Sequence, residues 1–394
     1  MTIIRSFNPI GQGAFYTERF YEKTDCKHII VFDCGVEYVD NKHIKYVQQA
    51  FSKNDRIDYL FISHLDEDHI SLVTTLKKAV GFIKNVVLPY IDIKDVVIMK
   101  MLAQSLGMNE VYAFWSDLYS EMEEPGRSET RYRFVVSEGQ DRIGRNDIRS
   151  GHDLSLGNDS DPDWIFKPYY RHPERKDDLE KQLEELLKDS DFQKALKGIG
   201  VQIGSVQELT DIISKAEFAT LIGNEKIKTS LRGAYKALTG GINKNSLVLY
   251  SGPAKEETRY RLYSPGIRGL LFSEDFDEPL FHHHFHYLYR KPACVYTGDS
   301  NLDMPGYSRD LGNLWNHVGT IQLPHHGSRS SFDFSHNIVS FTDTPYIFPV
   351  SCGEQNNYGH PSAEVLDYLR VHLCLPVVVT ENRSTRYSQM IVIH

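Results

Sequence analysis

The sequence predicts an α/β protein that carries a metal-binding site at the ends of its strands. Three observations lead to this prediction. Apolar runs alternate with helix-like stretches in the N-terminal part, a dense group of His and Asp follows one of these runs, and a helical segment separates this part from a second strand-rich part. We therefore expect two β-rich halves with a helical insertion between them.

Size and composition set the limits of this prediction. The chain has 394 residues, which is long enough for two domains or for one large domain with an insertion. Hydrophobic residues make up 41% and charged residues 25%, as in ordinary globular proteins. No apolar run reaches the roughly 18–20 residues of a membrane span, and the N-terminus lacks the apolar core of a signal peptide. We expect a cytoplasmic protein without membrane association.

Cysteine usage and charge argue against some classes of protein. The five cysteines are widely spread and never form a Cys-x-x-Cys pair, which argues against a disulfide framework and against a thiolate zinc site. The net charge is −9, whereas a protein that coats nucleic acid usually has an excess of positive charge. A nuclease is still compatible with this charge, because bound cations supply local positive charge for a transient substrate.

In the N-terminal part, chemically active groups follow predicted strands. Residues 27–32 and 57–62 are short apolar runs typical of buried strands. The first ends at an Asp-Cys-Gly sequence, and the second ends at residues 63–69, Ser-His-Leu-Asp-Glu-Asp-His. Helix-like stretches between residues 72 and 106 flank another apolar run at 86–89. This alternation predicts a βαβ arrangement.

The middle of the chain has a different pattern. From about residue 173 to about residue 240, apolar residues such as Leu183, Leu187 and Leu196 recur at helical spacing among Glu, Lys and Asp. We interpret this segment as a helical insertion, either a solvated cap or a surface that binds a protein partner. Strand-like runs then resume at residues 246–250, 293–297, 320–323, 346–350 and 376–380.

The strongest metal signal is the group His64, Asp66, Asp68 and His69, which follows a predicted buried strand. Divalent cations need several nitrogen or oxygen donors within about 2.0–2.2 Å, and a tight loop after a strand can aim alternate side chains at one point. An isolated histidine is more often a core or surface residue. A cluster of this density favours the metal interpretation instead.

Polar donors recur after three later strands. Asp299 follows one apolar run, and His325 and His326 follow the next. His360 comes after a third run, through a loop that contains Gln and Asn. Each position alone is compatible with an ordinary turn or surface loop. In open α/β sheets, however, ligands gather at the carboxyl ends of strands, so the joint occurrence of these residues predicts a single site.

This order of motifs resembles the metallo-β-lactamase superfamily, whose hallmark is His-x-His-x-Asp-His followed by a metal-bridging aspartate and further histidines. More narrowly, it is similar to the hydrolase domain of the bacterial DNA-internalisation competence proteins. The matching segments run in order from residue 10 to residue 361 and span nearly the whole chain apart from the helical middle and residues 281–290. They are residues 10–13, 32–35, 63–69, 245–249, 297–299, 324–328 and 357–361.

The resemblance implies a four-layer αβ/βα sandwich spanning residues 1–394, with a metal cleft between the edges of two sheets. It also implies two divalent ions, zinc or manganese. Asp66 stands where most relatives have a histidine, and the extra carboxylate makes manganese a serious competitor to zinc. The implied ligands are His64, Asp66, Asp68, His69, Asp299 as the carboxylate that bridges both ions, and one or both of His325 and His326.

Two positions depart from the pattern of the family. The group similar to this chain often has an aspartate after Gly-Gln-Gly, where this sequence has Ala14. Many superfamily members also have a ligand histidine between the first cluster and the bridging aspartate. His152 and His172 are the candidates for it here.

Two further segments admit a functional interpretation and a structural one. The group His282, His283, His284 and His286 is interleaved with aromatic residues, which favours a packed loop or helix face over a metal site. Residues 166–171 mix cations with aromatics, as in surfaces that stack on bases, but an ordinary strand exit explains them equally simply.

These observations predict a metal-dependent hydrolase. Two ions about 3.5–4 Å apart would activate a water for attack on phosphorus or on a carbonyl carbon. Asp68 and His360 are the predicted catalytic side chains, with His360 as the leaving-group acid or as a partner of a ligand. The resemblance implies nucleic acid as the substrate. A small ester, lactone or cyclic nucleotide, and a non-catalytic module that binds a partner through the helical insertion, are the alternatives.

Overall fold

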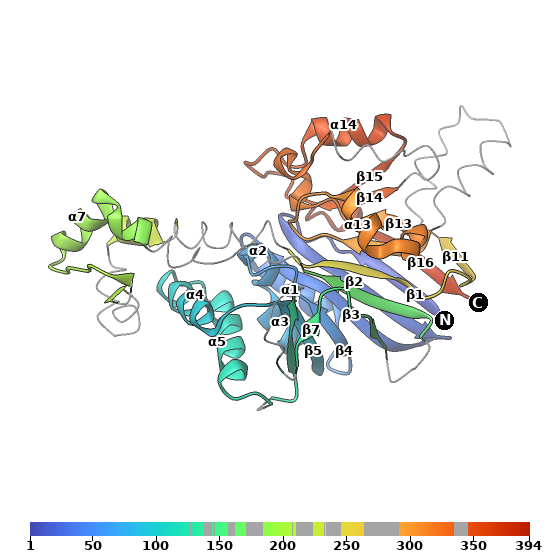
Figure 1. Cartoon of the computed structure of the whole chain (residues 1–394), viewed down its shortest axis with the longest axis horizontal. Helices are drawn as coiled ribbons and strands as arrows, with labels where there is room; N and C mark the ends of the chain where they lie inside the picture. The colour runs from blue at the N-terminus through green and yellow to red at the C-terminus, as the bar shows by residue number, and fades with distance from the viewer. Residues whose placement is uncertain are drawn as a thin grey trace.

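The described part of the chain contains two β-sheets that face each other (Figure 1). The computed structural model describes residues 1–126, 128–137, 144, 146–156, 162–170, 184–206, 208–209, 224–231, 233, 246–263, 291–334 and 346–394. The larger sheet has the strand order β11-β16-β1-β2-β3-β4-β5-β6-β7. Its strands are β1 (Thr2–Phe7), β2 (Gly13–Glu22), β3 (Asp25–Val36), β4 (Arg56–Phe61), β5 (Phe82–Pro89), β6 (Arg131–Val136), β7 (Ile148–Arg149), β11 (Tyr260–Tyr263) and β16 (Tyr387–Ile393).

The smaller sheet has the order β15-β14-β13-β12-β10-β9-β8. Strands β12 to β15 run parallel, as do β3 to β7 in the larger sheet. The carboxyl ends of each parallel set therefore lie at one edge of its sheet. The strands are β8 (Leu154–Ser155), β9 (Trp164–Tyr169), β10 (Val248–Pro253), β12 (Ala293–Tyr296), β13 (Val318–Ile321), β14 (Ile347–Ser351) and β15 (Leu375–Val379).

Helices cover the outer faces of both sheets. In Figure 1, α1, α3, α4 and α5 lie on the side of the larger sheet, and α13 and α14 lie on the side of the smaller one. The helices are α1 (Asn41–Ala50), α2 (Glu67–Ile70), α3 (Val73–Ala79), α4 (Ile93–Ser105), α5 (Asn109–Glu123), α7 (Ser190–Gly198), α13 (Met304–Leu311) and α14 (Ala363–Val371).

The alternation of side chains along the strands produces these layers. In β3, Val31 packs into the core under the helices, whereas Phe32 packs into the core between the sheets. Phe166 and Tyr296 fill the same central core from the smaller sheet. A third core lies between the smaller sheet and helices α13 and α14. The predicted four-layer αβ/βα sandwich is confirmed.

A buried ion pair links the two sheets. Arg5 Nε of β1 lies 2.6 Å from Glu18 Oε1 of β2, and both side chains are buried. Arg5 also donates to the carbonyl oxygens of Ser251 and Pro292, while the hydroxyls of Tyr296 and Ser251 donate to Glu18. Burial would lower the pKa of Arg5, but the charge of Glu18 raises it above its ordinary value. The guanidinium therefore stays charged and holds the strands of both sheets.

Part of the predicted helical insertion is described. Residues 173–183, 207, 210–223, 232 and 234–240 lie outside the described residues, as do His172 and the histidines of 281–290. In helix α7, Phe192 and Leu196 are buried, as their helical spacing predicts. No helix within the described ranges is long and apolar enough to cross a membrane. The extent and role of the insertion stay predictions.

Candidate metal centre

The site lies where the carboxyl ends of strands from both sheets meet. The segment from Ser63 to His69 follows β4 of the larger sheet, and its last residues form the short helix α2. Asp299 follows β12 of the smaller sheet. His325 and His326 lie in the 3-10 turn His325–Gly327 after β13. The structure thus brings the predicted donors of distant segments to one place.

Two glycines allow this close approach. A Cβ on Gly35 would lie 2.5 Å from the carbonyl carbon of His69 and 2.6 Å from that of Asp68, so β3 and α2 fit together only without one. Gly298 has a φ of 55° and faces Ser63, where a Cβ would lie 2.6 Å from that side chain. Both glycines occur in the motifs on which the resemblance to the metallo-β-lactamase superfamily rests.

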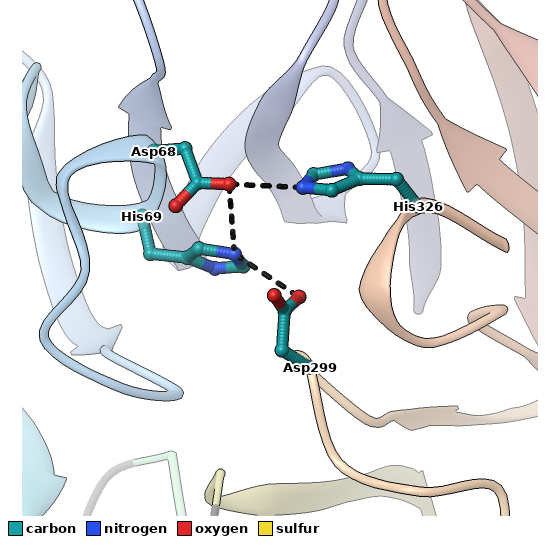
Figure 2. A group of neighbouring side chains, drawn as sticks. All are labelled: Asp68, His69, Asp299 and His326. Atoms are coloured by element: carbon teal, nitrogen blue, oxygen red, sulfur yellow. Dashed lines mark hydrogen bonds and ion pairs between the residues drawn. The ribbon is translucent and has the colours of Figure 1, made fainter. Parts of the chain in front are cut away.

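One group of donors consists of Asp68, His69, Asp299 and His326 (Figure 2), whose ligand atoms all lie within 4.8 Å of one another. His69 Nε2 lies 3.3 Å from Asp299 Oδ1 and 3.7 Å from Asp68 Oδ2. His326 Nε2 lies 2.9 Å from Asp68 Oδ2. These side chains point toward one another from three separate loops, so a cation between them would be bound by both halves of the fold.

A second group lies beside the first. Donor atoms of His64, Asp66 and Asp68 are also within 4.8 Å of one another. His64 Nε2 lies 3.8 Å from Asp299 Oδ2, and His325 Nε2 lies 3.8 Å from the same oxygen. Asp299 therefore turns one carboxylate oxygen to each group. This is the arrangement expected of a carboxylate that bridges two cations.

The adjacent histidines His325 and His326 face different carboxylates. His325 and His326 both have left-handed backbone conformations, with φ values of 49° and 53°. Such values are uncommon for residues other than glycine and occur often at functional sites. His325 faces Asp299 Oδ2, whereas His326 faces Asp68. The sequence alone left open which of the two lies at the site, and the structure brings both there.

Each of these four histidines is held through Nδ1, with Nε2 left to face the site. Histidines that bind metals usually have the other ring nitrogen fixed by a hydrogen bond, which sets the orientation of the ring. His69 Nδ1 lies 2.7 Å from Asp33 Oδ2, and His64 Nδ1 lies 2.9 Å from Ser63 Oγ and 3.2 Å from Ser246 Oγ. His325 Nδ1 lies 3.0 Å from Ser331 Oγ, and His326 Nδ1 lies 2.9 Å from the carbonyl oxygen of Ser351.

Asp33 is a supporting residue to which sequence reasoning assigned no role. It is fully buried with a φ of 54°, and it accepts hydrogen bonds from the backbone nitrogen and the hydroxyl of Ser63, each at 2.7 Å. Burial raises the pKa of its carboxyl group, while His69 and Ser63 oppose that shift. Its sequence signals are its position near the end of an apolar strand and its place in residues 32–35, one of the segments that resemble the superfamily.

Replacing Asp33 with asparagine is expected to weaken divalent-metal binding about 10- to 100-fold, because loss of a partner that orients a ligand typically has this effect. The dissociation constant for Mn²⁺ or Zn²⁺ of the purified variant measures it. Asp58→Asn is a matched control, because Asp58 holds His28 at 3.1 Å in a partly exposed pair outside the site. Equal affinity in Asp33→Asn and the wild-type protein, or an equal loss in both variants, would contradict the role of Asp33.

The pKa shifts of Asp299 and His64 favour the forms that bind a cation, whereas the neighbouring carboxylates raise the pKa of His69 and His326 in the absence of a metal. Burial would raise the pKa of Asp299, but the imidazoles of His69 and His64 hold it well below its ordinary value. Burial lowers the pKa of His64 to about 3, helped by the neighbouring His69. An ionised carboxylate and a neutral imidazole are the forms that bind metals.

Buried polar atoms that form no hydrogen bond test whether the donor residues fit a metal ion. Nε2 of His64, Nε2 of His69 and Oδ1 of Asp299 are buried and form no hydrogen bond with any residue in the described ranges. Buried polar atoms almost always form a hydrogen bond, so these three atoms, two of which are paired only as ions at 3.3 Å, require an explanation. A bound cation supplies one, and the mixture of carboxylate and imidazole donors suits zinc or manganese. The residues present fit the metal centre that the sequence predicts.

His360 lies at the rim of the site. Its ring centroid is 5.6 Å from that of His325 and 6.5 Å from that of His326. Burial and these two neighbours lower its pKa to about 4. The predicted catalytic residue is therefore near the donors.

Other predicted positions lie elsewhere. Ala14 is buried in the central core, where its backbone pairs with Gly35. His152 is exposed and belongs to neither donor group among the described residues. Within residues 166–171, Phe166 is buried and Lys167 pairs with Asp153 at 2.9 Å. Residues 166–169 therefore belong to an ordinary strand, β9, and Arg171 lies outside the described residues.

Comparison with known protein families gives one result. Residues 21–90 match the model of the metallo-beta-lactamase superfamily. The matched segment runs from the end of β2 through β5 and contains Asp33 and the donors from His64 to His69, whereas Asp299, His325 and His326 lie outside it. No curated protein matches the sequence. The metallo-beta-lactamase match and the donor groups together support a metal-dependent hydrolase.

Proposed function

We propose that this chain is a phosphodiesterase that works with two divalent cations, zinc or manganese. The position of Asp299 carries this proposal, because its two oxygens face two different donor groups. A pair of cations that share a ligand is well suited to phosphodiester hydrolysis, in which both the attacking and the leaving oxygen need stabilisation.

Each cation would have its own set of ligands. We assign His64, Asp66 and His325 to one ion, and Asp68, His69 and His326 to the other, with Asp299 shared. His325 then takes the place of the intermediate histidine that the sequence pattern lacks. The three carboxylates make the centre harder than one built mainly from histidine, which favours manganese more than in a histidine-rich zinc site.

The ions, when bound, would acidify a water and stabilise charge that develops at phosphorus. The residues of the chain fix the geometry of this chemistry. Asp33, Ser63 and Ser246 orient the imidazoles, so little reorganisation is needed when a substrate binds. His360, beside His325 and His326, would contact the leaving-group oxygen. Asp68 links the two halves of the site through its contact with His326.

The experiment that tests this function compares substrates and metals. Metal-free protein is incubated with Mn²⁺ or Zn²⁺ and with bis(p-nitrophenyl) phosphate, single-stranded DNA, cyclic nucleotides or p-nitrophenyl acetate. We expect hydrolysis of phosphodiesters that stops on chelation and returns when metal is added. Faster turnover of the carboxylic ester than of any phosphodiester would favour a small ester or lactone as the substrate. No metal-dependent turnover at all would favour a binding module.

A further inference from the structure

The loop that carries His360 is fixed by one side chain. Asn356 Oδ1 accepts hydrogen bonds from the backbone nitrogens of Tyr358 at 3.2 Å and His360 at 3.0 Å. Asn356 Nδ2 donates to the carbonyl oxygens of Gly353 and His360. Both ends of the amide are therefore used within the loop. The conformation of residues 356–360 is set before any substrate arrives.

Tyr358 is held in place on this loop although it is exposed. Its side chain stacks on His360, with centroids 5.7 Å apart and an interplanar angle of 27°. Its hydroxyl donates a hydrogen bond to Glu37, just beyond the end of β3. The residue is nevertheless 54% exposed. One face of the ring is covered, its polar end is tethered, and much of the rest is open to solvent.

The ring of Tyr358 lies close to the candidate metal centre. It stacks on His360, whose ring in turn lies 5.6 Å from that of His325, a neighbour of Asp299. The hydrogen bond to Glu37 raises the pKa of the Tyr358 hydroxyl, which therefore stays protonated and tethered. Because Glu37 follows a strand of the larger sheet and Tyr358 a strand of the smaller one, this hydrogen bond joins the two halves of the fold beside the donors.

We propose that the open face of Tyr358 stacks on the base of a nucleotide whose phosphodiester lies over the metal centre. This inference deepens the proposed phosphodiesterase function and depends on it. A restrained aromatic ring is a good platform for a base, because less side-chain entropy is lost on stacking. The sugar between base and phosphate would bridge the interval from Tyr358 past His360 to the donors. The substrates are then nucleoside phosphodiesters rather than simple alkyl ones.

The test uses two esters with the same leaving group, thymidine 5′-(p-nitrophenyl phosphate) and methyl p-nitrophenyl phosphate. The readout is the ratio of their kcat/KM values with Mn²⁺ present. Tyr358→Leu is expected to lower the preference for the thymidine ester about 10-fold, within the range for loss of one base–aromatic stack. Tyr358→Phe keeps the ring and is expected to retain most of the preference. Tyr263→Leu is the matched control, because Tyr263 is an exposed tyrosine on the edge strand β11.

The outcomes separate this inference from the proposed function. A wild-type protein that hydrolyses both esters, with a ratio that Tyr358→Leu leaves unchanged, would overturn the base platform alone. A loss of preference in Tyr358→Leu that is partly restored in Tyr358→Phe and absent in Tyr263→Leu would support it. A wild-type protein that hydrolyses neither ester would overturn the proposed function, and the inference with it.

Discussion

Replacing Asp299 with alanine is expected to lower kcat/KM for phosphodiester hydrolysis by more than about 1,000-fold. Loss of a single stabilising donor typically costs about 100- to 1,000-fold. Asp299 should exceed this because its two oxygens face both donor groups. The rate of bis(p-nitrophenyl) phosphate hydrolysis at saturating Mn²⁺ measures the effect.

Asp303→Ala is the matched control for this substitution. Asp303 lies on the same loop, but its side chain caps α13 by accepting from the backbone nitrogen of Gly306. Loss of such a cap costs about 1 kcal/mol of stability and should leave hydrolysis nearly unchanged. Substantial activity in Asp299→Ala at high metal concentration would show that this carboxylate is not part of the metal centre.

The largest loss of stability is expected for Arg5→Met. Removing one partner of a buried ion pair costs about 3–5 kcal/mol, because the remaining charge has no compensation. Here Glu18 would keep two hydroxyl donors but lose its cation between the sheets. The free energy of unfolding from urea denaturation, without added metal, measures the change.

Two further variants test whether the loss of stability in Arg5→Met comes from the unpaired charge of Glu18. The double variant Arg5→Met/Glu18→Met removes both charges and is expected to recover part of the lost stability. Arg370→Met breaks an exposed pair with Asp367 and should cost about 0–1 kcal/mol. If Arg5→Met were no worse than Arg370→Met, the buried network would have no role in joining the sheets.

Much of the fold follows from local sequence patterns. The apolar runs at 27–32, 57–62 and 293–297 lie in or end just beyond β3, β4 and β12, because β-branched and aromatic residues suit a buried pleated strand. Donors that come directly after such strands meet because parallel strands end at the same edge of a sheet. The positions of His64, Asp299 and His326 could therefore be anticipated.

Other features depend on contacts between distant segments, which no local pattern encodes. The pairing of β1 with β16 joins the two ends of the chain. This pairing brings Gln389 into hydrogen-bond contact with Arg5. Ser246, whose hydroxyl contacts His64 Nδ1, lies on the other side of the helical middle in the sequence. His325 and His326 point to different donors because of their left-handed backbone, and nothing in a His-His pair reveals that conformation.

The number of cations that the chain binds is the most direct test of the two-ion centre. Calorimetric titration of metal-free protein with Mn²⁺, supported by metal analysis after dialysis, counts them in the wild-type protein and in Asp299→Ala. We expect two ions per wild-type chain and marked weakening of both sites in the variant, because each donor group loses an oxygen of Asp299. A single ion per wild-type chain, or two ions that bind equally well without Asp299, would contradict the shared carboxylate.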